Sequence, residues 1–205
     1  NNQLKFKPVS EESGTSYDSF TFQVVDDSGA VNDTDTTPNT MTIDVTPVND
    51  PPVINELNAD SLAYAVGSGA QTVDVGSLAT VTDVDSTDFN GGVLTINTPT
   101  NFPAAANEIL TIDGTTGNGI TVAGANVLFN GDIIGTFAGG TAGTPLVVNF
   151  TTTDATPAAA SALLQTINYE NTGSSTGAST VTFQITDGDG GTSNLATVTI
   201  NLTDQ

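Results

Sequence analysis

Short runs in which apolar and polar residues alternate are the main regularity of this chain. A period of two places alternate side chains on opposite faces of a strand, so each run predicts a strand with one buried face. Gly, Asn, Asp or Pro bounds each run, as is usual for strands joined by tight turns. The runs are Leu4–Lys7, Phe20–Val24, Met41–Val45, Leu94–Ile96, Ile109–Ile112, Leu146–Phe150, Val181–Ile185 and Val198–Leu202.

One segment breaks this alternation and predicts a short helix. Thr156-Pro157 is followed by a stretch rich in Ala and Leu that continues to Ile167. Threonine is a good N-cap, and proline is well tolerated in the first turn of a helix. We expect this helix to cross from one sheet to the other, and we expect turns at Asn90-Gly91, Asn118-Gly119 and Asn130-Gly131.

An internal repeat divides the chain. Residues 20–29 (FTFQVVDDSG) parallel residues 181–190 (VTFQITDGDG), and residues 41–46 (MTIDVT) parallel residues 198–203 (VTINLT). Residues 1–50 are therefore expected to be the C-terminal strands of a partial domain, and residues 51–205 a complete β-sandwich. This arrangement indicates a fragment of a longer protein. Between the two parts, Pro51 and Pro52 stiffen the chain into an extended link.

The charge of the chain excludes several classes of function. The 205 residues include 23 Asp and Glu against two basic residues, which gives a net charge of −21. Phosphate binding needs clustered Lys and Arg, so we expect no nucleic-acid partner, and no apolar run is long enough for insertion in a membrane. With no His and no Cys, the common nucleophile and zinc chemistries are missing. We expect no enzyme, since only a carboxylate-pair hydrolase would remain.

Two acidic motifs resemble those of cadherin-like repeats. Val48-Asn-Asp-Pro-Pro-Val-Ile54 is similar to their interdomain linker, and Thr82-Asp-Val-Asp85 is similar to the Asp-x-Asp motif that follows their second strand. Thr186-Asp-Gly-Asp-Gly-Gly191 resembles the acidic turn between their last two strands. The segments 127–136 and 163–169 further resemble a tandem repeat of large bacterial surface adhesins.

The resemblance implies tandem immunoglobulin/cadherin-like Greek-key β-sandwiches that bind Ca²⁺ at the junction between repeats. It also implies an extracellular protein of the bacterial cell surface. Its partners would be neighbouring repeats of the same chain and a cell-surface glycan or protein. Thr46-Pro47 stands where these repeats usually carry an acidic residue, and their Asp-Arg-Glu segment is missing, so the number of calcium ions stays open.

Topology places the acidic residues in the same region. In an immunoglobulin-like sandwich, the N-terminal segment, the loop after the second strand and the last hairpin loop share one end. The expected calcium ligands there are Asn49, Asp50, Asp83, Asp85 and Asp187, joined from the partial domain by Glu11 or Glu12. Two carboxylates 4 Å apart repel by roughly 4 kcal/mol at an effective dielectric constant of 20. Calcium removes this repulsion because it binds six to eight oxygen ligands.

Two alternatives remain open at this point. Asp is common in turns, so Asp187 and Asp189 could serve the turn alone. A calcium-dependent carbohydrate-binding module would also be acidic and rich in strands. It would need aromatic platforms, and the chain has no Trp and only Tyr17, Tyr64 and Tyr169.

Overall fold

The computed structural model describes residues 3–27, 29, 33–98 and 105–205. The chain separates into two compact units, Asn1–Val48 and Asn49–Gln205. Most of the ordered structure is β, with several sheets and one short α-helix, as the alternating runs predict. Among the described residues, no helix is both long and apolar enough to cross a lipid bilayer.

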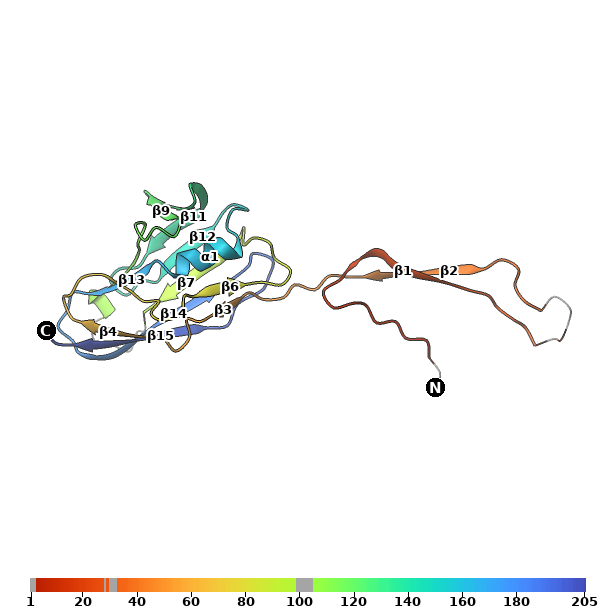
Figure 1. The fold of residues 1–205 in the computed structure, drawn as a ribbon, viewed down its shortest axis with the longest axis horizontal. Coiled ribbons are helices and arrows are strands. Elements are labelled where there is room, and N and C mark those ends of the chain that lie inside the picture. The colour runs from red at the N-terminus through yellow and green to blue at the C-terminus, as the bar shows by residue number, and fades with distance from the viewer. Residues whose placement is uncertain (1–2, 28, 30–32, 99–104) are drawn as a thin grey trace. The chain divides into compact units, whose positions relative to one another are not determined.

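The first unit is a two-stranded hairpin of β1 (Gly14–Phe22) and β2 (Asn39–Val45), which pair antiparallel (Figure 1). None of its described residues is buried. The strand expected over Leu4–Lys7 does not form. Backbone groups of an extended segment stay bonded to water unless a neighbouring strand pairs with them, and the described part of this unit offers the segment no such neighbour.

The second unit holds all the other elements. Its strands are β3 (Val53–Asn55), β4 (Ser61–Ala65), β5 (Gln71–Thr72), β6 (Thr80–Thr82), β7 (Val93–Asn97), β8 (Glu108–Ile112), β9 (Ile120–Ala123), β10 (Asn126–Phe129), β11 (Asp132–Gly139), β12 (Leu146–Phe150), β13 (Ile167–Asn171), β14 (Gly177–Ile185) and β15 (Ala196–Thr203). Its helices are the 3₁₀ turn η1 (Ala105–Asn107) and α1 (Pro157–Leu164).

The strands of the second unit form three sheets. The largest has the order β4-β15-β14-β7-β12-β11-β10-β9, the second is β5-β13-β8, and β3 pairs with β6. Among the strand pairs that the described residues of this unit form, β15–β4 alone is parallel, and the others run antiparallel. At the β10–β11 hairpin, Asn130 and Gly131 both have positive φ (55° and 100°), which is the geometry that an Asn-Gly pair adopts easily.

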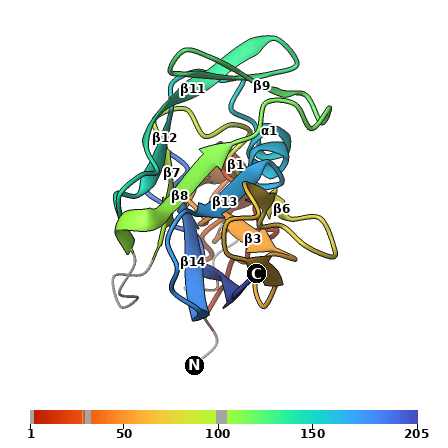
Figure 2. The ribbon, with the colours of Figure 1, turned by 90° about the vertical axis from the view of Figure 1, so that its left-hand side faces the viewer.

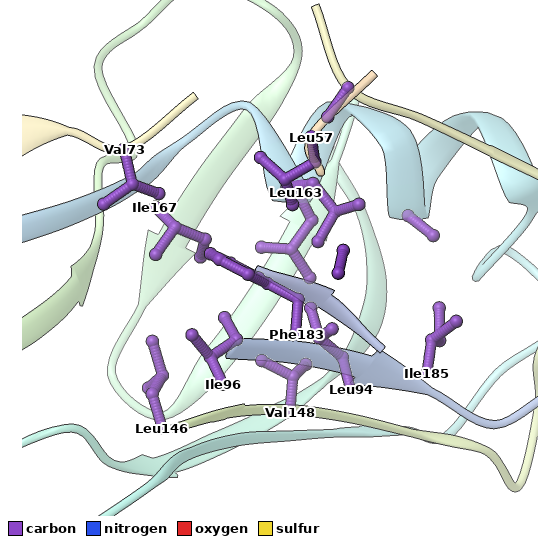
Figure 3. Close-up of a cluster of buried hydrophobic side chains, with 14 of the residues drawn as sticks. Leu57, Val73, Leu94, Ile96, Leu146, Val148, Leu163, Ile167, Phe183 and Ile185 are labelled. Atoms are coloured by element: carbon purple, nitrogen blue, oxygen red, sulfur yellow. The ribbon is translucent and has the colours of Figure 1, made fainter. Parts of the chain in front are cut away.

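The core of the second unit lies between these layers. Apolar residues of β14 and β7 face residues of α1 and β13 across the cluster drawn in Figure 3, where Phe183, Leu94, Leu163 and Ile167 are all fully buried. Each strand contributes alternate residues to this cluster, as a period of two requires. The alternating runs of the sequence therefore identify the residues that stabilise the fold.

Helix α1 begins as the sequence predicts and ends earlier. The Thr156 hydroxyl caps it by accepting a hydrogen bond from the Ala159 N–H at 3.2 Å. The helix lies beside β6 (Figure 2), where the Ser161 hydroxyl accepts from the Val81 N–H at 2.7 Å. It ends at Leu164, because Ile167 already pairs with Ile112 of β8. Pairing with a neighbouring strand overrides the helix preference of the last residues.

A buried polar cluster joins β8, β13 and β14. Glu108 is 1% exposed, and its Oε1 accepts hydrogen bonds from the Tyr169 hydroxyl at 2.9 Å and the Ser179 hydroxyl at 2.8 Å. The Asn171 side chain donates to the Tyr169 oxygen at 3.2 Å, and the Tyr64 ring packs edge-on against Tyr169. Burial, together with the nearby Glu108 carboxylate, holds the pKa of Tyr169 well above its usual value.

Removing the Tyr169 hydroxyl tests this cluster. Tyr169→Phe should lower the free energy of unfolding by roughly 1–3 kcal/mol, because Glu108 loses a buried donor. The raised pKa means that the neutral phenol is favoured in the folded state. The contribution of the Tyr169 hydroxyl to the free energy of unfolding is therefore present below about pH 10 and is lost as the pH rises further. The variant should lack this part of the loss of stability at alkaline pH. Urea unfolding at pH 7 and pH 11 measures both effects. Tyr17→Phe, in the first unit, is the control; equal stability of parent and Tyr169→Phe would contradict the prediction.

Candidate metal site

Three segments of the second unit meet where β6 and β14 end and β7 begins. They are residues 49–52 at its N-terminus, the loop after β6 and the loop between β14 and β15. In Figure 1 both loops extend to the end of the unit at which residues 49–52 lie. Thr186, which directly follows β14, is hydrogen-bonded to Val93, the first residue of β7. Its N–H donates to the Val93 carbonyl at 2.9 Å, and its hydroxyl accepts from the Val93 N–H at 2.8 Å.

Asp83 and Asp85 form a tight acidic turn directly after β6. One carboxylate oxygen of Asp83, Oδ1, accepts the N–H groups of Asp85 at 3.2 Å and Ser86 at 2.9 Å. This side chain-to-backbone pattern is typical of Asp in turns. The other oxygen, Oδ2, is buried and has no hydrogen-bond partner in the described structure. Burial raises the pKa of Asp83, and the adjacent Asp85 carboxylate raises it further.

The Asp85 carboxylate reaches the N-terminal segment of the second unit. Its two oxygens lie 3.4 Å and 3.2 Å from the Asp50 backbone nitrogen, which donates to them. Asp83 thus shapes the turn, and Asp85 connects this turn to Asp50. The result is a concentration of negative charge in a unit that contains no Lys or Arg.

Asp187 organises the loop between β14 and β15. It is fully buried, and its Oδ1 accepts three backbone N–H groups, from Asp189 at 2.7 Å, Gly190 at 2.9 Å and Gly191 at 2.9 Å. Its Oδ2 accepts from the Asn49 amide at 2.8 Å. Burial alone would raise the pKa of Asp187. The hydrogen bonds from Asn49 and the loop backbone outweigh this effect and hold the pKa below its usual value.

The bond to Asp187 fixes the orientation of the Asn49 side chain. An ionised carboxylate only accepts hydrogen bonds, so the Asn49 NH₂ group must face it, and the amide oxygen of Asn49 remains as a ligand atom. Gly191 makes this approach feasible. A Cβ at this position would lie 2.1 Å from Asp187 Oδ2 and 2.8 Å from the Pro51 Cα, so any larger residue would collide with both.

Of the seven residues that the sequence singled out, the structure joins Asp50 to Asp85, which shares a turn with Asp83, and it separately joins Asn49 to Asp187. The other two, Glu11 and Glu12, belong to the first unit and are exposed. There Glu11 accepts from the Ser10 hydroxyl at 2.9 Å, and Glu12 accepts from the Tyr17 hydroxyl at 2.6 Å.

Sequence reasoning missed Gly191, and it missed the positioning of Asn49 by Asp187. The signal for Gly191 was present in the Gly190-Gly191 pair that follows Asp187-Gly-Asp189. Two successive glycines in a short loop indicate a position where the backbone of another segment approaches closely. The partner in that approach, Pro51, is far away in sequence, so only the fold identifies it.

The donor set of this end fits a hard cation. Carboxylate and amide oxygens are the ligands that calcium prefers, and the buried Asp83 Oδ2 is an acceptor for which the described atoms provide no donor. In the part of the chain that the structure describes, no group of three or more acidic side chains is placed so that it could hold a metal ion. The groups at this end that could supply oxygen ligands are the carboxylates of Asp83, Asp85 and Asp50 and the amide oxygen of Asn49.

Comparison of the chain with protein-family models and with curated protein sequences finds no match.

Proposed function

We propose that this chain is a calcium-binding structural segment of a long extracellular bacterial adhesin, with immunoglobulin/cadherin-like sandwiches in tandem. Calcium binds at the N-terminal end of the second unit and stiffens the link to the preceding unit. The observation that carries the proposal is the buried, unpartnered Asp83 Oδ2, next to Asp85 and directly linked through it to Asp50.

Calcium suits these residues better than other common cations. Asp83, Asp85 and Asp50 supply carboxylate oxygens and Asn49 supplies an amide oxygen, while Asp187 holds Asn49 in place. Six to eight oxygens at flexible angles satisfy Ca²⁺, whereas Mg²⁺ demands a strict octahedron and keeps its waters. A Kd near 10 μM in about 1 mM calcium would stabilise the bound state by roughly 2.7 kcal/mol.

The stiffening follows from where the ligands lie. Asn49 and Asp50 belong to the segment that leads into the second unit, and Asp83 and Asp85 belong to a loop of its body. An ion that binds both sets fixes the direction in which the chain leaves this unit toward Val48. Calcium binding then restricts bending at the link, and an extended surface stalk requires this stiffness.

The structure offers less support for carbohydrate binding. Sugar-binding platforms generally present an exposed aromatic ring, but Tyr64 and Tyr169, the tyrosines of the second unit, are both fully buried. Their rings pack against each other in the core. Asp83, Asp85 and Asp187 are engaged with backbone N–H groups, an arrangement that shapes loops and does not favour acid–base catalysis.

Small-angle X-ray scattering with and without calcium tests the stiffening. The chain should show a narrower range of conformations in 2 mM calcium than in EGTA. An Asp83→Ala/Asp85→Ala variant in calcium should scatter like the parent in EGTA. Asp132→Asn, a change at the exposed first residue of β11, should scatter like the parent in both buffers. Identical parent profiles in calcium and EGTA would overturn the proposal.

A further inference from the structure

The hairpin of the first unit is a structural copy of the last hairpin of the second unit. In β1–β2, Phe20 pairs with Met41, and in β14–β15, Val181 pairs with Val198. These are the residues that the sequence repeat aligns with each other. The agreement continues along the strands, where the pair Thr21–Thr40 corresponds to Thr182–Thr197. Sequence and strand register thus independently give the same equivalence.

The two copies differ in what covers their apolar face. In the second unit, Val181, Phe183, Ile185, Val198 and Ile200 are all fully buried. The equivalent residues of the first unit are far more accessible: Phe22 is 41% exposed, Val24 59% and Met41 50%. An isolated two-stranded hairpin is marginally stable in water, and both edges of this one present backbone N–H and C=O groups that can pair with another strand.

The neighbours of the β14–β15 hairpin show which strands a partner of the β1–β2 hairpin must provide. On one side, β14 pairs antiparallel with β7, from Thr182–Asn97 to Ile185–Leu94. On the other side, β15 pairs in parallel with β4, from Thr199–Ser61 to Thr203–Ala65. The α1–β13 layer then covers the apolar face (Figure 3). The positions equivalent to these edges in the first unit are residues 21–24, at the end of β1 and just beyond it, and residues 42–46, at the end of β2 and just beyond it.

We propose that β1–β2 is a docking surface for an incomplete β-sandwich, one that ends before its own last hairpin. This partner adds an antiparallel strand along residues 21–24 and a parallel strand along residues 42–46, and its apolar layer covers Phe20, Phe22 and Met41. The strands it adds alternate apolar and polar residues, as Leu94-Thr-Ile96 of β7 and Leu62-Ala-Tyr64 of β4 do. This inference is independent of calcium binding.

The chain itself contains a suitable probe. Residues 49–174 hold every strand of the second unit except β14 and β15. We would attach this segment through a flexible Gly-Ser linker to the N-terminus of the full chain and measure amide hydrogen exchange. In the unmodified chain, β1 and β2 should exchange rapidly. In the fusion their amides should exchange about tenfold or more slowly, with the β14–β15 amides as an internal standard.

Matched variants separate docking from nonspecific protection. Phe20→Asp/Phe22→Asp places two charges on the apolar face of β1 and should abolish the protection. Ser19→Asp/Thr21→Asp adds the same charge to the opposite face and should retain it. Unprotected β1 and β2 amides in the parent fusion would overturn the proposal. So would protection in the unfused chain that grows with its concentration, because the hairpin would then be pairing with a second copy of itself.

Discussion

Asp83→Asn is expected to change the stability of the second unit in opposite directions with and without calcium. The asparagine oxygen can still accept from the Asp85 and Ser86 N–H groups, as Asp83 Oδ1 does. Its NH₂ group replaces the buried, unpartnered Oδ2 and can donate to the Asp85 carboxylate. In EGTA this change removes a repulsion and adds a hydrogen bond, so the free energy of unfolding should rise by roughly 1 kcal/mol.

In calcium the same substitution removes a ligand oxygen and should be destabilising. Loss of the site forfeits the stabilisation of about 2.7 kcal/mol expected at a hundredfold excess of calcium over Kd. The net effect of Asp83→Asn in calcium is then a loss of roughly 1–2 kcal/mol. Urea unfolding in 1 mM calcium and in EGTA measures the two values. Asp132→Asn should be neutral in both buffers, and an Asp83→Asn effect of the same sign in both would contradict the metal site.

Asp187→Ala should be the most damaging single substitution at this end, in EGTA as well as in calcium. It leaves the N–H groups of Asp189, Gly190 and Gly191 without their acceptor and frees the Asn49 side chain. The loss of these hydrogen bonds to a charged acceptor should lower the free energy of unfolding by roughly 3 kcal/mol. Asp189→Ala is the matched control, because Asp189 lies in the same turn but is exposed.

The pH dependence of stability distinguishes the two acids. The pKa of Asp187 is lowered on folding, so its contribution is present above the ordinary Asp pKa of 3.8 and is lost as the pH falls through the lowered value. The pKa of Asp83 is raised, so in EGTA its contribution is present below 3.8 and is lost as the pH rises through the raised value. Urea unfolding in EGTA from pH 2.5 to 7 measures both. Asp187→Ala as stable as Asp189→Ala across this range would contradict the assigned role of Asp187.

Strands with strong alternation could be predicted from the sequence, and strands defined by their neighbours could not. The run Leu146–Phe150 coincides with β12, and Val198–Leu202 lies within β15. By contrast, β5 has two residues and exists because it pairs with β13. Leu4–Lys7 has the alternation of a strand but lacks a neighbour to pair with in the described structure. Alternation reports the face that a strand buries, and pairing decides whether the strand forms.

The candidate site, too, could be predicted only in part from the sequence. The strand order of an immunoglobulin-like sandwich predicted that these residues share one end of the second unit, and hydrogen bonds do join Asn49 to Asp187 and Asp50 to Asp85. The individual hydrogen-bond partners could not be predicted, because the Asn49–Asp187 and Asp50–Asp85 bonds join segments that are distant in sequence. Glu108 was missed as a buried residue although it precedes Leu110 by two positions and so shares its inward face. Its charge argued for the surface, whereas in the structure the Tyr169 and Ser179 hydroxyls donate to one of its two carboxylate oxygens.

Calorimetric titration of the full chain with calcium tests the central claim most directly. The parent should bind calcium with a Kd of about 10 μM, and Asp132→Asn should match it. The Asp83→Ala/Asp85→Ala variant should give no binding heat at the same concentrations. A parent that titrates like this double variant would show that the acidic end of the second unit does not bind calcium.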